Sequence, residues 1–378
     1  MTLLTTQPFK TVYVLLAAGF ELACLPFWIA RHITSYGRPH PGWTFRQALS
    51  VRLFFSLIWH IAKVQARTPL PLTPGKEKER FIVMKAKEAN KDMFRGPLIG
   101  NANVRPVDVG GTWYPAPLSR TSQLGNVVVV LHIHGGAYVI GDGRTASAGF
   151  MASNLLRHTP ATHVLAPQYR LSSLPASTTS NPFPAALQDS LTAYLYLLNE
   201  LGIPASSIVF SGDSAGANNA IALLRYLAEY GNELDIPSPS AALLWSPWLD
   251  PSDNTDDYVR TNPNYATDYL SHPFTRWGST AYAGLGGQAA LQTPYAALKG
   301  QPFRTEVPLF ANAGGAEVLC PDVKEWAAMM KKEGNHVTWD VEEGAPHDIL
   351  LVGNTLGFRA EAGRCAKRAG EWLREVRK

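Results

Sequence analysis

The stretch SIVFSGDSAGANNAIALLRYLAEY, residues 207–230, decides how the rest of the sequence is interpreted. It opens with an apolar, β-rich run, SIVFSG (207–212), and the part after Ser214 has the pattern of a helix. Between the two stands GDSAG (212–216), a G-x-S-x-G motif. In this setting the motif predicts a sharp strand-to-helix turn that holds the serine strained with its Oγ exposed. We therefore interpret Ser214 as a nucleophile, the alternative being a purely structural turn.

A nucleophilic serine needs N–H groups nearby that stabilise the oxyanion of its transition state. HGGA (134–137) directly follows the apolar run NVVVVLHIH (126–134), on the strand before the serine turn, where a second donor is expected. Two consecutive glycines let the backbone approach a substrate closely. We predict that the amides of Gly135, Gly136 and Ala215 form an oxyanion hole. A glycine turn that merely ends a strand is the alternative.

The general base is predicted to be His347, one of ten histidines. It lies in EGAPHD (343–348), a loop that follows the last strand-like run near the chain end. This position agrees with the chain order serine, acid, histidine. His132 and His134 belong to the oxyanion segment, and we expect them to shape that segment.

The acid of such a triad should lie between Ser214 and His347, on a loop after a strand. The segment ANAGGAEVLCPD (311–322) follows a β-like run and offers Glu317 and Asp322. Glu317 comes first after the glycines, so its carboxylate is in reach of the histidine. Asp322 lies about one turn further on, where a helix cap is the simpler role. We favour Glu317 and keep Asp322 as the alternative.

Short apolar runs alternate with helical patterns from about residue 79 onward, which predicts an α/β fold with a mostly parallel sheet flanked by helices. FIVMKA (81–86) and VRPVDVGG (104–111) predict an antiparallel start. The later strands are expected at 126–134, 163–169, 207–212, 242–247, 308–314 and 336–342, and the helices at 145–157, 184–202, 214–230, 320–334 and 358–377.

The chain divides into three expected parts: a hydrophobic N-terminal segment (1–32), N-terminal cap helices (33–78) and a catalytic domain (79–378). Within the catalytic domain, residues 251–300 interrupt the alternation with many aromatics and without a clear strand. We expect this insertion to be a helical cap over the site.

Several motifs together resemble the hormone-sensitive-lipase-like branch of the α/β-hydrolases (esterase/lipase, alpha/beta hydrolase fold-3). They are HGGA (134–137), GDSAG (212–216), YRL (169–171), FPAALQD (183–189) and SPWLD (246–250). The similarity spans about residues 100–375 and implies an α/β-hydrolase fold, a serine triad and no metal or organic cofactor. Ala137 replaces the family's third glycine, and Glu317 stands where the family usually has Asp.

Composition excludes several other classes of protein. Hydrophobic residues make up 46% and charged residues 17% of the chain, which suits a large buried core. A net charge of +4 without a basic block argues against nucleic-acid binding. The three cysteines have no metal-ligand spacing, and the chain has no Asn-x-Ser/Thr sequon, as expected in a reducing compartment.

The apolar stretch TVYVLLAAGFELACLPFWIA (11–30) has about the 20 residues needed to cross a bilayer. Glu21 and Pro26 weaken that interpretation, because a central carboxylate costs a few kcal/mol in a membrane. A helix packed on the enzyme and a cleaved signal peptide are the alternatives. The helical pattern at 45–66 predicts a helix packed on the core or, alternatively, on a membrane surface.

Basic residues around this stretch predict the orientation of a membrane anchor. Lys10 is the single Lys or Arg before it, whereas Arg31, Arg38 and Arg46 follow it closely. By the positive-inside rule the catalytic domain faces the cytosol, and in a eukaryotic cell we expect the endoplasmic reticulum. A cytoplasmic or secreted enzyme is the alternative.

Taken together, the sequence predicts a serine hydrolase that cleaves a carboxylic ester. Aromatic residues of the two covering segments favour a neutral hydrophobic substrate, and we expect a short acyl group, such as acetyl, on a bulky alcohol. These aromatics are Trp43, Phe54, Phe55, Trp59, Tyr258, Tyr265, Tyr269, Phe274, Trp277 and Tyr282. Ordinary cap packing is the alternative for the aromatics. An acyltransferase or cyclase, or a non-catalytic ligand-binding protein, is the alternative for the function.

Overall fold

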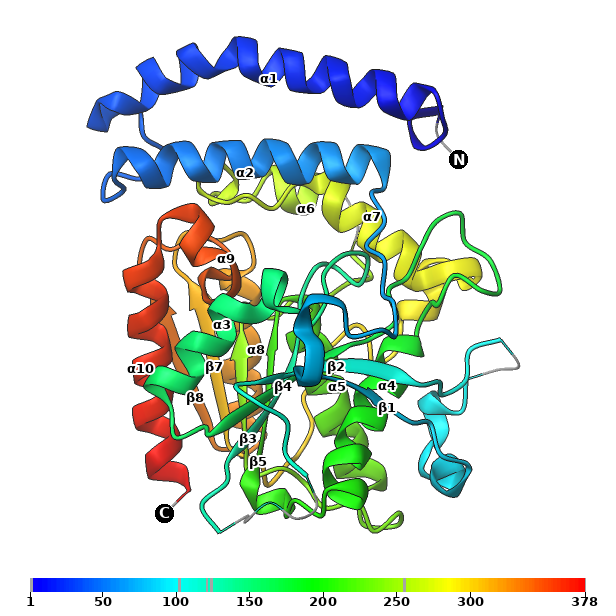
Figure 1. Ribbon diagram of the computed structural model, residues 1–378. Coiled ribbons are helices and arrows are strands. Elements are labelled where there is room, and N and C mark those ends of the chain that lie inside the picture. Colours follow the sequence, from blue (N-terminus) through cyan, green and yellow to red (C-terminus); the bar gives the residue numbers. More distant parts are fainter. Residues whose placement is uncertain (1–2, 101–102, 120–121, 123–124, 254–255, 378) are drawn as a thin grey trace.

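The computed structural model describes residues 3–100, 103–119, 122, 125–253 and 256–377. A sheet of eight strands, in the order β1-β2-β4-β3-β5-β6-β7-β8, runs through the molecule (Figure 1). β1 and β2 are antiparallel to their neighbours, and the strands from β4 to β8 are parallel. The strands are β1 (Phe81–Met84), β2 (Val109–Tyr114), β3 (Val129–Ile133), β4 (His163–Gln168), β5 (Ile208–Asp213), β6 (Ala241–Trp245), β7 (Leu309–Gly314) and β8 (Val337–Glu342).

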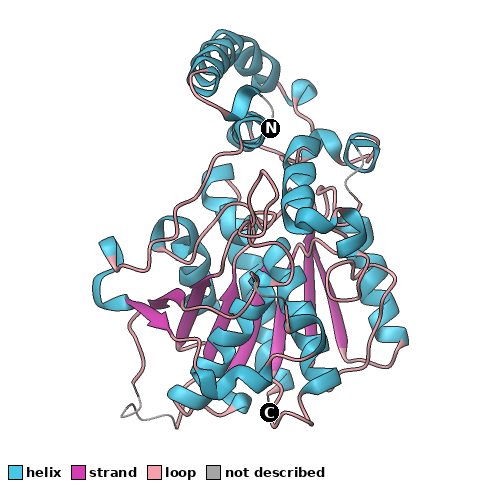
Figure 2. Cartoon of the chain, turned by 90° about the vertical axis from the view of Figure 1, so that its right-hand side faces the viewer, coloured by secondary structure: helices cyan, strands magenta, loops and turns pink. Residues whose placement is uncertain are grey.

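Helices cover both faces of the sheet (Figure 2), which explains why its central strands are apolar throughout. All residues of β3, β5 and β6 are buried. The helices α3, α9 and α10 pack against one another, α4 packs against α5, and α8 packs on β7 and β8. They are α3 (Thr145–His158), α4 (Ala185–Leu195), α5 (Ala215–Tyr230), α8 (Cys320–Lys332), α9 (Ile349–Leu356) and α10 (Arg359–Val376).

The predicted alternation of strands and helices is confirmed, with two local corrections. β2 begins at Val109 instead of residue 104. The predicted C-terminal helix is preceded by α9, ILLVGNTL, which the sequence pattern did not reveal. α9 is short and its polar residues are limited to Asn354 and Thr355, so its helical period is weak in the sequence. Its start is set by Asp348, whose Oδ1 accepts a hydrogen bond from the Leu351 amide (3.3 Å).

The described part of the insertion expected at 251–300 is helical, with α6 (Asp256–Arg260), α7 (His272–Ala283) and several short 3₁₀ turns. α7 lies directly on the HGGA loop, because a Cβ added at Gly278 would stand 2.5 Å from the carbonyl oxygen of Ala137. The ring of Tyr282 stacks on Tyr138 with centroids 3.8 Å apart. The cap therefore fixes the loop that ends β3.

The N-terminal residues form an outer layer above the cap (Figure 1), made of α1 (Phe9–Ile33) and α2 (Phe45–Val64). α2 begins with a capping box between Thr44 and Gln47 and packs on α7 and α9. α1 packs on α2. Within the described residues, α1 is the one helix long and apolar enough to cross a membrane, judged by length and composition alone.

Trp43 connects this layer to the hydrolase domain. It is 3% exposed, and its indole N–H donates a hydrogen bond to the carbonyl of Gly344, at the base of the His347 loop. Its ring meets Phe358 edge-on, with centroids 5.5 Å apart. One buried indole therefore joins the α1–α2 connection to the loop that carries the predicted base.

Replacing Trp43 by Ala should lower the free energy of unfolding by about 3–5 kcal/mol, because a large buried ring and a hydrogen bond are lost together. Urea denaturation measures the change. Tyr36→Ala in the same connection is the control; Tyr36 is fully exposed, and its loss should cost less than about 0.5 kcal/mol. Equal effects of the two substitutions would show that Trp43 does not hold the layer in place.

Candidate active site

Ser214 stands at the turn between β5 and α5 with a backbone conformation that few non-glycine residues adopt, φ 51° and ψ −118°. Two glycines make the turn feasible. A Cβ at Gly212 would lie 2.4 Å from the carbonyl oxygen of Gly216, and one at Gly216 would lie 2.0 Å from that of Ile133. The Ser214 amide donates to the Trp245 carbonyl (2.8 Å), which holds the strained residue against β6.

His347 and Glu317 form a buried pair at the same edge of the sheet. Nδ1 of His347 lies 3.4 Å from Oε2 of Glu317, and the two side chains are 2% and 0% exposed. This contact is longer than an ideal hydrogen bond, as catalytic contacts often are before substrate binds. Burial lowers the pKa of His347, but its interaction with Glu317 and the charges of Asp268 and Asp213 outweigh burial, so the pKa is raised above its usual 6.5.

Asp322, the alternative acid, is directed elsewhere. Its carboxylate accepts hydrogen bonds from the Tyr258 hydroxyl (2.7 Å) and from Nζ of Lys299 (2.8 Å). It occupies the first turn of α8, as expected for a residue that favours a helix N-terminus. The structure thus brings Glu317, and not Asp322, to His347.

The segment after β6 connects the three loops that carry Ser214, Glu317 and His347. The Ser246 hydroxyl donates to Oε2 of Glu317 (2.6 Å) and accepts from the Asp348 amide (3.1 Å). The amide of Trp248 donates to the Ser214 carbonyl (3.1 Å). These contacts give a physical role to SPWLD (246–250), which the sequence marked only as a familiar motif.

The HGGA loop corrects one residue of the predicted oxyanion hole. The Gly135 amide donates to Oδ2 of Asp213 (2.7 Å), so it is engaged inside the protein. Gly136 and Ala137 follow with positive φ, 102° and 52°, and within the described residues their amides donate to no protein acceptor. The first amide of α5, that of Ala215, has no partner within its helix. The free amides are therefore those of Gly136, Ala137 and Ala215.

Asp213 gathers a network that sequence reasoning missed. Its Oδ1 lies 2.8 Å from Nε2 of the buried His132, while Oδ2 accepts the Gly135 amide. Asp348 hydrogen-bonds to the same carboxylate. Burial and the neighbouring charge of Asp213 raise the pKa of Asp348 well above its usual range. The serine turn, the HGGA loop and the His347 loop are thereby tied to one carboxylate.

Asp268 of the cap supplies a second such tie. It is 2% exposed, its Oδ1 accepts from the His347 amide (3.2 Å), and its Oδ2 accepts from the Val318 amide (2.7 Å). Burial raises the pKa of Asp268 to about 6, although the charge of His347 opposes this. One carboxylate thus joins the cap to the loops of Glu317 and His347. A sequence signal was lacking, because Asp268 stands in an irregular segment far from both.

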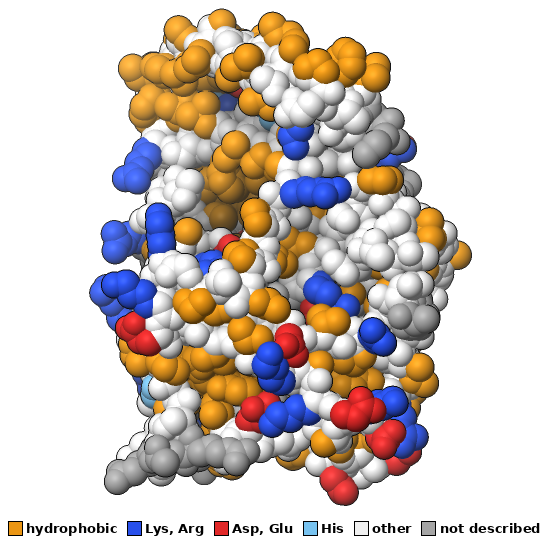
Figure 3. Space-filling view, turned by 45° about the vertical axis from the view of Figure 1, so that its right-hand side comes forward, with side chains coloured by type: hydrophobic (Ala, Val, Ile, Leu, Met, Phe, Trp, Pro, Cys, Tyr) orange, Lys and Arg blue, Asp and Glu red, His pale blue; other side chains and the backbone are white. Residues whose placement is uncertain are grey.

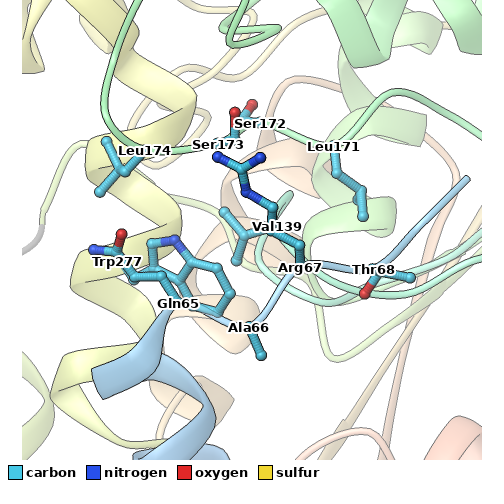
Figure 4. Close-up of a pocket in the computed structure, with 10 residues that line it drawn as sticks. All are labelled: Gln65, Ala66, Arg67, Thr68, Val139, Leu171, Ser172, Ser173, Leu174 and Trp277. Atoms are coloured by element: carbon cyan, nitrogen blue, oxygen red, sulfur yellow. The ribbon is translucent and has the colours of Figure 1, made fainter. Parts of the chain in front are cut away.

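A pocket of about 130 Å³ lies beside the HGGA loop (Figure 4). Trp277 of α7, Arg67 from the segment after α2, and Val139 line it together with Gln65, Ala66, Thr68, Leu171, Ser172, Ser173 and Leu174. Its volume is well below the roughly 300–1,000 Å³ of typical ligand sites. Ser214 itself is 9% exposed. The pocket is therefore small, and Ser214 is nearly buried.

The family model for the alpha/beta hydrolase fold matches residues 130–351 of this chain. The chain belongs to the α/β-hydrolase family. The predicted fold class and family are thereby confirmed. The matched region of this α/β-hydrolase contains Ser214, Glu317 and His347, together with the free amides of the HGGA loop and α5.

Individual relatives of this α/β-hydrolase are distant. An acetyl-hydrolase of Streptomyces hygroscopicus is 31% identical over 213 residues, which are 56% of this chain and 64% of that protein, slightly less than two thirds. Esterase LipU of Mycobacterium tuberculosis is 28% identical over 257 residues, 65% of this chain and 77% of its own length. The crystal structure of an esterase from the bacterial hormone-sensitive lipase family superposes with a TM-score of 0.59 at 24% identity and covers 95% of this chain and 98% of that one, a likeness of fold.

Glu317→Gln should move the acid limb of the kcat/KM profile to lower pH and lower kcat by about a hundredfold or more. A base must be neutral, so activity is present above the pKa of His347 and lost as pH falls through it. The charge of Glu317 raises that pKa, and its removal lowers the value. The measurement is kcat/KM from pH 4 to 9 with a soluble ester.

Asp322→Asn is the matched control. Both the acid limb of its kcat/KM profile and its kcat should stay close to those of the unmodified enzyme. The opposite ranking, with Asp322→Asn the more damaging substitution, would transfer the role of the acid to Asp322.

Proposed function

We propose that this protein is a serine esterase that hydrolyses a carboxylic ester with Ser214 as nucleophile, His347 as general base and Glu317 as the acid. The observation that carries the proposal is the strained Ser214 beside free amides, at the sheet edge that also holds the buried His347–Glu317 pair. The names of the relatives, an acetyl-hydrolase and an esterase, support the same reaction class.

The mechanism is a two-step acyl transfer. His347 takes the proton of the Ser214 hydroxyl as its Oγ attacks the ester carbonyl. The amides of Gly136, Ala137 and Ala215 stabilise the oxyanion of the tetrahedral intermediate, and no metal or organic cofactor is required. His347 then protonates the leaving alcohol, and water releases the acid by the same steps.

Glu317 orients the imidazole and stabilises the imidazolium that forms during each step. Its burial strengthens this effect, because water does not screen the interaction. Ser246 donates to the same carboxylate oxygen, Oε2, that faces His347, and so fixes its position. An acyltransferase would use the same groups with an alcohol in place of water. A non-catalytic binding protein would need neither the strained serine nor the buried pair.

A fluorophosphonate probe should label the protein at Ser214, and Ser214→Ala should abolish both labelling and turnover. His347→Ala should lower turnover by several orders of magnitude, and the double variant should be no worse than either single one, because the two groups act as a unit. Unchanged labelling of Ser214→Ala would reject the nucleophile. Products analysed with and without added alcohol distinguish hydrolysis from acyl transfer.

For the substrate, we propose a neutral ester with a short acyl group on a bulky hydrophobic alcohol. Four of the ten aromatics of the covering segments pack α2 against the cap: Phe54 meets Tyr269 at 4.8 Å and Phe55 meets Tyr265 at 5.9 Å between ring centroids. The ring of Tyr269 also meets that of His347, with centroids 5.7 Å apart. Trp277 lines the pocket beside the HGGA loop. The small volume of that pocket, about 130 Å³, suits a short acyl chain.

With one alcohol and acyl chains from acetyl to palmitoyl, kcat/KM should peak at two to four carbons. The reason is steric, because a longer chain would have to displace Trp277 or the residues after α2. Trp277→Ala should shift the optimum to longer chains, which locates the acyl group. A maximum beyond about ten carbons in the unmodified enzyme would contradict the short-acyl proposal.

We further propose that the enzyme is attached to a membrane through its N-terminal layer, with the catalytic domain on the cytosolic side, at the endoplasmic reticulum in a eukaryotic cell. The apolar length of α1 supports attachment, and the lack of an Asn-x-Ser/Thr sequon in the sequence fits a catalytic domain on the cytosolic side. A bulky apolar alcohol would partition into the same membrane.

A further inference from the structure

α1 is built with its polar face toward the protein and its apolar face toward the outside. The residues turned toward α2 recur at spacings of three and four along the helix. They are Lys10, Tyr13, Ala17, Glu21, Cys24, Leu25, Trp28 and His32. His32 is buried and the others are partly buried, and most of the eight are polar or aromatic. This is the reverse of a helix on the surface of a water-soluble protein, where the apolar stripe faces the core.

The polar groups of α1 have partners on α2. Oε1 of Glu21 lies 3.2 Å from Nε2 of His60, and the Tyr13 hydroxyl lies 2.8 Å from Nδ1 of the same ring. Arg52 approaches Glu21 at 3.9 Å and places its guanidinium over the Trp28 ring, 4.2 Å from the centroid. The single acidic residue of α1 therefore has both of its charge partners, His60 and Arg52, on α2.

The outer face of α1 carries most of the large exposed hydrophobic side chains of the described residues, and it appears as the apolar upper surface in Figure 3. They are Phe9 50%, Val12 51%, Leu15 68%, Leu16 69%, Phe20 63%, Leu22 69%, Phe27 59%, Ile29 39% and Ile33 62% exposed. Contiguous apolar patches larger than a few hundred Å² mark interaction sites, because leaving them in water costs about 25 cal/mol per Å².

The charge of this layer is complementary to an anionic lipid surface. Residues 1–67 contain seven of the 34 Lys and Arg residues of the chain but only one of its 30 acidic residues, Glu21. Because the whole chain has a net charge of +4, the rest of the protein has a small acidic excess. Positive charge thus gathers on the layer whose outer face is apolar, which is the combination that binds membrane surfaces.

We propose that α1 lies in the plane of a membrane surface, with its apolar face in the boundary between headgroups and acyl chains, and does not cross the bilayer. This deepens the membrane attachment proposed above and rests on it. Crossing would separate Glu21 from His60 and Arg52 and move a carboxylate into lipid, at a cost of a few kcal/mol or more. Lying flat keeps every one of these contacts.

Arg38 holds the C-terminal end of α1 in place relative to the rest of the protein. Its Nε and one terminal nitrogen donate to the carbonyls of His32 and Ile33, at 3.0 Å each, which are among the last carbonyls of α1. Its other terminal nitrogen donates to the Trp43 carbonyl (2.9 Å). The end of α1 is therefore tied to Trp43, which is itself docked on the His347 loop. A membrane under α1 would have a defined position relative to the catalytic residues.

A cavity of about 370 Å³ lies between this layer and the catalytic residues. Trp28, His32 and Arg52 line it on the side of the helices, and Tyr265 and Asp268 line it on the side of the cap. Asp268 binds the His347 amide. The flat orientation would therefore bring an apolar substrate dissolved in the membrane to the helices that line this cavity.

Vesicle flotation tests attachment. The full chain, synthesised in a cell-free system with vesicles of phosphatidylcholine and phosphatidylserine, should float with them, and more of it than with phosphatidylcholine alone. Leu16→Glu combined with Phe20→Glu should reduce the floated fraction by about tenfold or more while hydrolysis of a soluble short-chain ester is retained. Ile99→Glu with Leu285→Glu is the matched control, since these side chains are 62% and 67% exposed elsewhere, and should float normally.

Protease protection separates a flat helix from a spanning one. An N-terminal epitope should be digested by protease added outside sealed vesicles, because a flat α1 leaves its N-terminus on the side of the catalytic domain. Protection until detergent is added would overturn the proposal in favour of a spanning helix. An active protein that does not float would overturn membrane binding and leave the esterase proposal intact. An active protein that forms a dimer abolished by Leu16→Glu with Phe20→Glu would have the same meaning. An inactive protein that floats would support membrane binding and overturn the esterase proposal.

Discussion

The strained backbone of Ser214 is the constraint on which the rest of the site depends. Its φ of 51° can persist because Gly212 and Gly216 leave room for the turn and because the Ser214 amide is bonded to the Trp245 carbonyl of the neighbouring strand. The turn sets the first amide of α5 and the hydroxyl side by side, which is the arrangement that acyl transfer needs. The strain costs about 1–3 kcal/mol, and the buried parallel sheet around β5 is rigid enough to hold it.

Buried carboxylates hold the other loops of the site in position relative to this turn. Asp213 binds the Gly135 amide and His132, and Asp268 binds the amides beside Glu317 and His347. Such groups are costly to bury, and each of these two carboxylates is bound by backbone amides, Asp213 by the imidazole of His132 as well. Their benefit is positional: atoms from five separate segments meet at one edge of the sheet without relying on a single long loop.

Sequence reasoning succeeded where the signal is local. The strand-to-helix turn around Ser214 and the alternation of strands and helices follow from periodicity and from residue order. The choice of Glu317 over Asp322 rests on residue order too and stays a prediction, with Glu317 the carboxylate that lies beside His347. Sequence reasoning failed where contacts are distant. The engagement of the Gly135 amide depends on Asp213, 78 residues later, and Asp268 reaches His347 across 79 residues. The sequence did not predict that α1 turns its polar residues toward the protein, because the helix is apolar overall and its few polar residues show no clear pattern. Their common face is recognisable from the position of α2.

We propose above that Ser214 attacks the ester carbonyl while the amides of Gly136, Ala137 and Ala215 hold the oxyanion. A crystal structure of the covalent adduct with a short alkyl phosphonate tests it most directly, since the phosphonate is a stable analogue of the tetrahedral intermediate. We expect phosphorus bonded to Oγ of Ser214, one phosphoryl oxygen about 3 Å from all three amides, and the Gly135 amide still bound to Asp213. A phosphoryl oxygen bound by Gly135 and remote from Ala137, or an adduct on another residue, would contradict the account.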